Sequence, residues 1–183
     1  GEPVVIHADL GSSDGWKPTA EAILEQLGPV DILVNSAGIG GTQQTVSEHD
    51  EEKWLDVIDT NLNGCFRMIK ACMPGMIERG WGRIVSIGST AARTAVPKYA
   101  AYCASKGGLV LMTKSMAVEV DHRGVRVNCI CPGGVSTPLV SALAFPARVF
   151  SASAFRFARS SCALRAWISR SFLRLAFVAS SSS

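Results

Sequence analysis

Two side chains of the right types for proton transfer stand near the middle of the chain. Tyr102 and Lys106 are four residues apart in a segment rich in Ala, Leu and Met, so on a helix they share one face. A phenol with a pKa of about 10 is a poor base at neutral pH, and a nearby ammonium group lowers that pKa. The pair therefore suits general acid–base catalysis, although the same spacing is also typical of a solvated surface pair.

A serine adds a third polar group to this pair. Ser89 precedes Tyr102 by thirteen residues and follows the apolar run Arg83–Ile87, where its hydroxyl would be free to hydrogen-bond a substrate oxygen. Ser86 is an alternative, but it stands inside that run. Ser105 has no base placed beside it, so we predict that it packs within a helix.

Apolar runs of strand length alternate with longer segments of helical period. This alternation predicts an α/β protein with a parallel sheet covered on both faces. The expected strands are Val4–Ala8, Asp31–Val34, Arg83–Ile87 and Arg126–Ile130, and the expected helices are Thr19–Leu27, Asp50–Arg79 and Tyr102–Val120. Polar or glycine-containing segments follow each strand, at the sheet edge where such folds bind ligands.

Six motifs in order resemble the short-chain dehydrogenase/reductase family. Together they span roughly residues 1–140, and agreement of all six by chance is improbable. They are Asp9 after the first strand, Asn35-Ser36-Ala37-Gly38, Asn61-Leu62-Asn63-Gly64, Ser89, Tyr102-Cys103-Ala104-Ser105-Lys106, and Asn128 to Pro132-Gly133 with Thr137.

The resemblance implies a partial Rossmann-like, doubly wound parallel sheet in residues 1–140. Motif order aligns the chain with strands three to six of the family sheet, so strands one, two and seven are missing. The family's glycine-rich turn, which receives the pyrophosphate at a helix N-terminus, has no counterpart in the printed sequence. We therefore expect the 183-residue chain alone to be inactive.

The resemblance also implies roles for four side chains. Tyr102 would exchange the proton with the substrate oxygen, and Ser89 would orient the substrate and stabilise its oxyanion. Lys106 would hold the nicotinamide ribose and lower the tyrosine pKa. Asn61 would hold a water that relays protons from Lys106, with Asn63 as the alternative that the N-x-x-G spacing disfavours.

A nicotinamide cofactor, NAD or NADP, is a further implication. Its choice cannot be read, because the discriminating residue of the family follows strand two. The residues implied to line its cleft, besides Tyr102 and Lys106, are Asp9, Leu10, Asn35, Ala37, Gly38, Pro132, Gly133, Val135 and Thr137.

Within the family the chain is most similar to ketoreductases of the 3-oxoacyl-carrier-protein reductase type. This similarity implies a small-molecule carbonyl or alcohol substrate, a homo-oligomer (dimer or tetramer) and a cytoplasmic location. The alternative is a non-catalytic remnant that pairs through its helices with an intact homologue. The two helices concerned are Asp50–Arg79 and the helix from Tyr102.

Charge divides the chain in two. Residues 1–140 hold all 15 acidic residues and 12 of the 18 basic ones, whereas residues 141–183 hold six arginines and no acidic residue. No basic stripe with aromatic residues appears in the body, so a nucleic-acid partner is not expected. Prolines and glycines interrupt the longest uncharged stretch, 127–147, which argues against a membrane-spanning helix.

The tail, residues 141–183, is rich in Ser, Arg and Ala and does not resemble the family. We interpret it as a foreign segment, helical or disordered. The alternative is a basic amphipathic helix lying on an anionic membrane surface, since five of its arginines gather on one side of a helical wheel. The six cysteines form no C-x-x-C pair and have no cluster of histidines, so we expect reduced thiols and no metal site.

Overall fold

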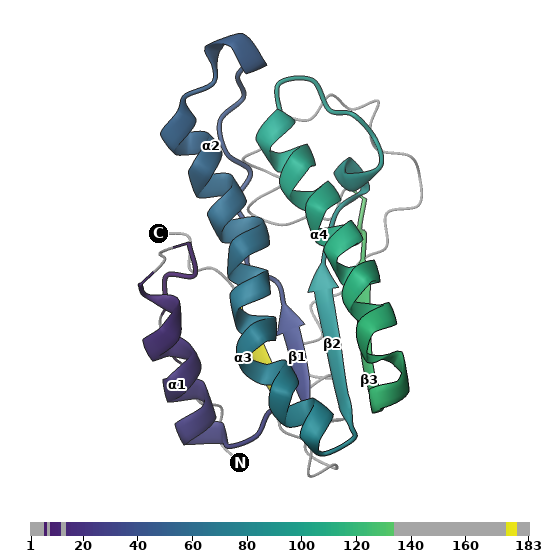
Figure 1. Cartoon of the computed structure of the whole chain (residues 1–183). Helices are drawn as coiled ribbons and strands as arrows, with labels where there is room; N and C mark the ends of the chain where they lie inside the picture. The colour runs from purple at the N-terminus through teal and green to yellow at the C-terminus, as the bar shows by residue number, and fades with distance from the viewer. Residues whose placement is uncertain (1–5, 7, 12–13, 134–174, 179–183) are drawn as a thin grey trace.

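The fold is a parallel β-sheet with helices packed on it (Figure 1). The computed structural model describes residues 6, 8–11, 14–133 and 175–178. All strand pairs are parallel, and the strand order is β3-β2-β1-β4. The strands are β1 (Ile32–Asn35), β2 (Gly82–Ile87), β3 (Val125–Ile130) and β4 (Leu175–Val178).

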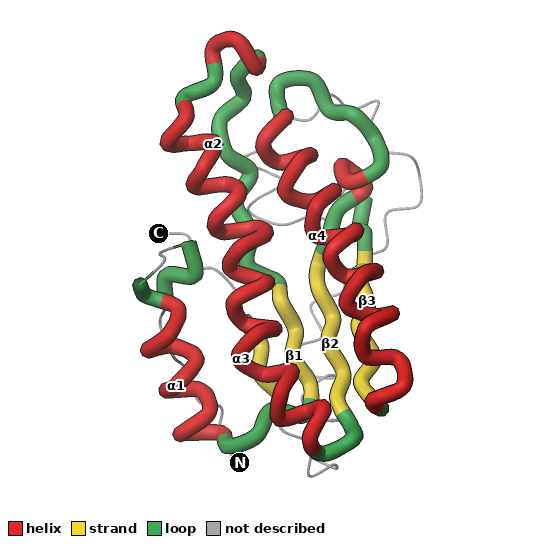
Figure 2. The backbone as a smooth tube through the Cα atoms, in the orientation of Figure 1, coloured by secondary structure: helices red, strands yellow, loops and turns green. Residues whose placement is uncertain are grey.

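The helices of the described chain lie on one face of this sheet (Figures 1 and 2). Their bounds are α1 (Trp16–Leu27), α2 (Glu51–Ile58), α3 (Gly64–Glu78) and α4 (Ala100–Val120), with short 3₁₀ turns at Val46–Glu48, Thr90–Ala92 and Asp121–Arg123. We predicted helices on both faces, and the helices within residues 14–133 cover one of them. Along β2, buried and half-buried residues alternate, as expected when one face meets the helices.

Local sequence explains where the long central helix begins and ends. The carboxylate of Asp50 caps α2 by accepting a hydrogen bond from the Lys53 backbone N–H at 3.1 Å. Gly80 follows α3 with a φ of +66°, a conformation that glycine adopts at little cost. Between α2 and α3, Asp59–Asn63 forms one π-helical turn. The predicted helix Asp50–Arg79 is therefore confirmed in outline, but the π-turn inside it was not foreseen.

The larger of two apolar clusters in the described part of the chain joins the helices to the sheet. It contains Leu33 of β1, Ile84 of β2 and Val127 of β3, together with Met68 and Met76 of α3. Leu33, Ile84, Met68 and Met76 are each fully buried. Removal of this apolar surface from water is the main force that fixes the helices against the strands.

The strand predicted at Val4–Ala8 does not form at the two residues of this range that the structure describes. Ile6 and Ala8 belong to no strand and contribute only apolar contacts to the core, while the rest of Val4–Ala8 lies outside the described residues. The edge of β1 instead pairs with β4, in register from Ile32 with Leu175 to Asn35 with Val178. The tail, predicted to be helical or disordered, thus supplies a strand at 175–178.

The other predicted strands are confirmed with shifts of one residue at their ends. Among the helices of the described chain, none is both long enough and apolar enough to cross a membrane.

Candidate active site

The hydroxyl groups of Tyr102 and Ser89 meet at the end of β2. Ser89 follows that strand and caps the next 3₁₀ turn by accepting a hydrogen bond from the Ala91 backbone N–H at 3.1 Å. Tyr102 lies in the first turn of α4 and is 7% exposed. The Ser89 hydroxyl lies near enough to the Tyr102 phenol to lower the pKa of Tyr102, against the larger effect of burial. The thirteen-residue spacing noted in the sequence therefore brings both hydroxyls to one point.

Lys106 approaches the same place from the next turn of α4. Its side chain is 4% exposed, and Nζ donates a hydrogen bond of 2.9 Å to the carbonyl oxygen of Ile87, two residues before Ser89. Nζ also lies 5.8 Å from the centre of the Tyr102 ring. The ammonium group is thus held beside the phenol by the end of β2.

Asn61 is fully buried in the π-turn between α2 and α3. Its Oδ1 accepts a hydrogen bond from Ile39 N at 2.7 Å, and its Nδ2 donates to Ile39 O at 2.9 Å and to Ser105 Oγ at 3.0 Å. Ser105 Oγ in turn donates to Tyr102 O at 2.8 Å. A π-turn at a functional position is common in proteins, and here it aims the amide of Asn61 at both the loop after β1 and helix α4.

Gly38 marks the point where these groups converge. A Cβ atom on Gly38 would lie 3.3 Å from Asn61 Oδ1 and 3.3 Å from Lys106 Nζ. A side chain at this position would therefore fill the space between the amide and the ammonium group. The four predicted catalytic residues, Asn61, Ser89, Tyr102 and Lys106, thus lie in one region of the structure, and Gly38 leaves space beside them.

The neighbouring residues of the Asn35–Gly38 turn serve the core. Ala37 is buried in it. Asn35 is 2% exposed, and its Nδ2 donates a long hydrogen bond of 3.5 Å to Ser86 Oγ, while its Oδ1 has no partner among the described residues. Ser86 itself is fully buried within β2, whereas Ser89 is half-buried, so the hydroxyl of Ser89 is the more accessible of the two.

The pKa of Tyr102 departs from the expectation. Burial raises it above its ordinary value, and the nearby Ser89 hydroxyl opposes this increase. We predicted a net decrease caused by Lys106, and that prediction is wrong for this arrangement. The reason is geometric, because Lys106 Nζ faces the ring and bonds to Ile87 rather than to the phenol oxygen.

Burial also lowers the pKa of Lys106, since an ammonium group is costly to hold away from water. The nearby thiols of Cys65, Cys129 and Cys131 oppose this decrease. Burial thus favours the neutral form of both members of the Y-x-x-x-K pair.

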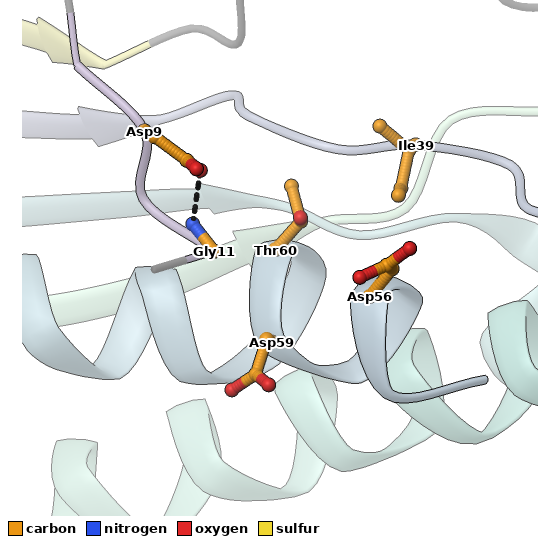
Figure 3. A pocket seen from close by; sticks show the side chains of 6 residues that line it. All are labelled: Asp9, Gly11, Ile39, Asp56, Asp59 and Thr60. Atoms are coloured by element: carbon orange, nitrogen blue, oxygen red, sulfur yellow. Dashed lines mark hydrogen bonds between the residues drawn. The ribbon is translucent and has the colours of Figure 1, made fainter. Parts of the chain in front are cut away.

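A cavity of about 370 Å³ opens beside this cluster (Figure 3). It is lined by Asp9, Gly11, Ile39, Asp56, Asp59 and Thr60. Asp9 Oδ1 accepts a hydrogen bond from Gly11 N at 2.9 Å, and Figure 3 shows these two residues on one loop, with Thr60 on the facing helix. Ile39 connects the two places, because its backbone is held by Asn61 while the residue lines the cavity.

The remaining predicted cofactor residues fall into three groups. Leu10 is 5% exposed and packs in the core, so its side chain is not available to a ligand. The Pro132 carbonyl accepts a hydrogen bond from Thr90 N at 2.9 Å, and Gly133 lies near the Thr90 side chain. Val135 and Thr137 lie outside the described residues.

The structure also distinguishes the alternatives left by the sequence. Asn63 Nδ2 donates to Asp59 Oδ1 at 2.6 Å, away from the cluster that Asn61 joins. Ser105 is a buried connector between Asn61 and α4.

The amino-acid sequence did not lead us to Arg67, which holds the loop of Leu10 and Gly11 to the helix. Its guanidinium donates to the Leu10 and Gly11 carbonyls at 2.9 and 3.1 Å and pairs with Asp59 at 3.4 Å. Its position eight residues after Asp59 on one long helix was the only available signal.

Comparison with known proteins shows the family of the chain. Residues 1–145 match the family described as short chain dehydrogenase. The chain belongs to this family. It is 47% identical over 137 residues to a Streptomyces coelicolor protein named "Putative ketoacyl reductase", covering 74% of this chain and 52% of that protein. It is 40% identical over 131 residues to the 3-oxoacyl-[acyl-carrier-protein] reductase FabG of Haemophilus influenzae, covering 69% of this chain and 54% of the relative.

A solved structure shows the same fold. It is described as a putative NAD(P) dependent gluconate 5-dehydrogenase from Beutenbergia cavernae with bound NADP at low occupancy. The TM-score is 0.69 at 36% identity, and the match covers 74% of this chain and 54% of that one. The chain thus spans about half the length of the relatives that it matches.

The residues present fit a nicotinamide cofactor of this family. The absence of a side chain at Gly38 leaves room between Asn61 and Lys106 that a Cβ would occupy, and the next residue, Ile39, lines the cavity beside Asp9. Glycine at such a point permits close approach of a ligand to the backbone.

Proposed function

We propose that this chain carries the proton-transfer site of an NAD(P)-dependent oxidoreductase that interconverts a carbonyl group and a secondary alcohol. The observation that carries the proposal is the placement of Lys106, whose Nζ is held by the Ile87 carbonyl 5.8 Å from the Tyr102 ring centre, with the Ser89 hydroxyl close enough to act on the phenol. A substrate oxygen within reach of both hydroxyls would receive a proton from one and a hydrogen bond from the other. The cofactor, when bound, supplies or accepts the hydride.

Each residue has one task in this proposal. Tyr102 donates the proton to the carbonyl oxygen, or takes it from the alcohol. Ser89 orients that oxygen and stabilises its developing negative charge. Lys106, held beside the phenol by the Ile87 carbonyl, would hold the nicotinamide ribose. Asn61 holds Ile39 and Ser105 in place and keeps the amide oxygen facing the space over Gly38.

Binding of NAD or NADP would use the same end of the sheet. Gly38, Tyr102 and Lys106 would border the nicotinamide half, and Asp9 would contact the adenine half. Pro132, Gly133, Val135 and Thr137 complete the proposed contacts, and the choice between NAD and NADP is left open. The substrate class that we favour is a 3-oxoacyl thioester or a similar ketone, as in the names of the relatives.

Two further points belong to the proposal. The whole protein is expected to form a homo-oligomer. A reducing, cytoplasmic location is supported by the five cysteines of the described chain, all of which are free thiols.

The first test is activity in a completed fold. The 183-residue chain holds no glycine-rich pyrophosphate turn, so we expect no turnover of a 3-oxoacyl thioester with NADH or NADPH. A chimera in which residues 1–133 replace the matching segment of the H. influenzae relative should turn over. In that chimera Ser89→Ala should lower kcat by about 10²-fold. Ordinary turnover by the 183-residue chain alone would overturn the inactivity, and an unchanged kcat for Ser89→Ala would overturn the assignment of Ser89.

A second candidate function is supported by apolar side chains on the helix surfaces. Phe66 of α3 is 46% exposed, and Leu111 and Val118 of α4 are 69% and 78% exposed. Large exposed apolar residues are typical of protein interfaces, so the chain could act as a remnant that pairs with an intact homologue. Co-purification with a full-length homologue, lost in Val118→Glu and without cofactor binding, would favour this function over catalysis.

A further inference from the structure

The end of β3 carries two cysteines that the proposed chemistry does not use. Cys129 and Cys131 are separated by one residue, Ile130, which is 52% exposed. Because side chains alternate along a strand, Cys129 lies on the face opposite to that of Ile130. Cys131 follows the strand, and its Sγ lies near Gly88 as that of Cys129 does. Cys129 is in register with Ser86 of β2, which is fully buried on the side of the helices. The Cys129 thiol therefore lies on the side of the helices, and both thiols are near enough to Lys106 to oppose the decrease of its pKa.

The two sulfur atoms converge on one glycine. A Cβ atom on Gly88 would lie 2.8 Å from Cys129 Sγ and 3.0 Å from Cys131 Sγ. The first distance is shorter than a real Cβ contact and the second is tight, so the absence of a side chain at Gly88 makes room for the pair. The neighbouring Cys131 thiol also acts on the pKa of Cys129. Gly88 immediately precedes Ser89, and its N–H donates to Ile130 O at 2.7 Å.

The electrostatics show which ligands suit this pair. Burial, and then the neighbouring Cys131, raise the pKa of Cys129 to about 11, while the Gly88 backbone and Lys106 oppose the increase. A thiol of high pKa holds little thiolate at neutral pH and reacts slowly with peroxides. A ligand that bonds to both sulfurs at once and carries the protons away escapes this restriction. Among the described side chains, no group of three or more His, Cys, Asp or Glu gathers, so a tetrahedral zinc site is not favoured.

We propose that Cys129 and Cys131 form a dithiol site for a soft, thiophilic centre of the trivalent organoarsenical class. Two S–H bonds and the arsenic–oxygen bond break, and two arsenic–sulfur bonds form. Both thiol protons leave with the oxygen as one water molecule, so no oxidant is needed. The bound group presses on Gly88 and thereby displaces Ser89 from Tyr102.

The test uses phenylarsine oxide with the full 183-residue chain. Mass spectrometry should show one phenylarsenic group bound with loss of two hydrogens. The adduct should map to the tryptic peptide 127–148, which contains Cys129 and Cys131 and no other cysteine. An excess of 2,3-dimercaptopropanol should remove it, and an equal excess of a monothiol should not.

Substitutions test whether capture of the arsenical depends on the two sulfurs beside Gly88. Because the second sulfur binds intramolecularly, Cys129→Ser or Cys131→Ser should each weaken capture by about 10²-fold, and Cys103→Ser should leave it unchanged. Gly88→Ala should weaken capture because its Cβ displaces both sulfurs. Gly107→Ala is the matched control, since a Cβ there meets only the Ala92 carbonyl oxygen at 3.8 Å. Circular dichroism spectra confirm that each variant folds.

Three results would overturn the proposal: an adduct on another peptide, equal capture by Cys129→Ser, or equal capture by the two glycine variants. A second readout checks the link to Ser89. Hydrogen exchange at Thr90 and Ala91 should increase when the arsenical binds, and unchanged exchange would remove the claimed displacement.

Discussion

Replacement of Asn61 by alanine should destabilise the fold much more than the same replacement at Asn63. Both asparagines lie in the π-turn Asp59–Asn63, so the change in helix propensity is the same for both and favours alanine by roughly 0.6 kcal/mol. The difference lies in what each amide holds. Asn61 is fully buried and makes three hydrogen bonds, whereas Asn63 makes one, to Asp59.

The expected magnitude follows from the groups left behind. Asn61→Ala leaves the N–H and C=O of Ile39 without their partners, and each such loss costs about 1–2 kcal/mol. Ser105 keeps its bond to the Tyr102 carbonyl, so it adds little. With the helix propensity subtracted, we expect a loss of about 2–3 kcal/mol for Asn61→Ala. For Asn63→Ala we expect a change close to zero, because its part-buried partner Asp59 also pairs with Arg67.

Urea unfolding of the 183-residue chain, followed by far-UV circular dichroism at pH 7, measures both values. The midpoint should fall for Asn61→Ala at an unchanged m-value. If the two variants differ by less than about 0.5 kcal/mol, the hydrogen bonds of Asn61 do not hold the β1 loop to the π-turn, and the reasoning is refuted.

Three further outcomes are expected. Gly107→Ala should raise the free energy of unfolding by about 0.5–1 kcal/mol, because helix α4 has room for the methyl group. Gly124→Ala should lower it by at least about 1 kcal/mol, because Gly124 has a φ of +73° and its Cβ would collide with the Gly80 carbonyl. Thermal unfolding compares the two variants, and an equal effect would contradict both expectations. Burial raises the pKa of Cys72 from 9.0 to about 11, so the thiol loses its proton at a lower pH in the unfolded chain, and the free energy of unfolding falls as the pH rises from 9 to 11. The urea midpoint of Cys72→Ala should fall less over this range than that of the unchanged chain. Parallel plots of midpoint against pH would contradict the raised pKa of Cys72. Arg67→Ala removes the guanidinium from the Leu10 carbonyl and should speed hydrogen exchange in residues 9–11, a change that Arg126→Ala, at an exposed site on β3, should not produce.

Much of the fold could be predicted because its strands are short apolar runs that end at polar motifs. The run Arg83–Ile87 is one example, and its strand differs by one residue. The strand at Leu175–Val178 could not be predicted, since Leu175 also fits the apolar face of a helix. Pairing with β1 decides its conformation, and a partner more than a hundred residues away leaves no local signal.

The candidate site could likewise be predicted only in part. The spacing of Ser89, Tyr102 and Lys106 was sufficient to predict that they meet, because it depends on one strand end and one helix face. The direction of the Tyr102 pKa shift was not predictable, since it depends on burial and on the Ile87 carbonyl that holds Lys106. The π-turn around Asn61 was also hidden, because one extra residue in a long helix barely changes its apolar period.

The measurement that tests the central claim most directly is the effect of Tyr102→Phe in the chimera that carries residues 1–133. Phenylalanine keeps the ring in its buried place and removes only the hydroxyl that lies near Ser89. We predict that kcat for a 3-oxoacyl thioester falls by about 10²–10⁴-fold, while the dissociation constant of NADPH or NADH, measured by fluorescence, is little changed. A Tyr102→Phe chimera that retains most of its kcat would contradict the claim that this tyrosine transfers the proton.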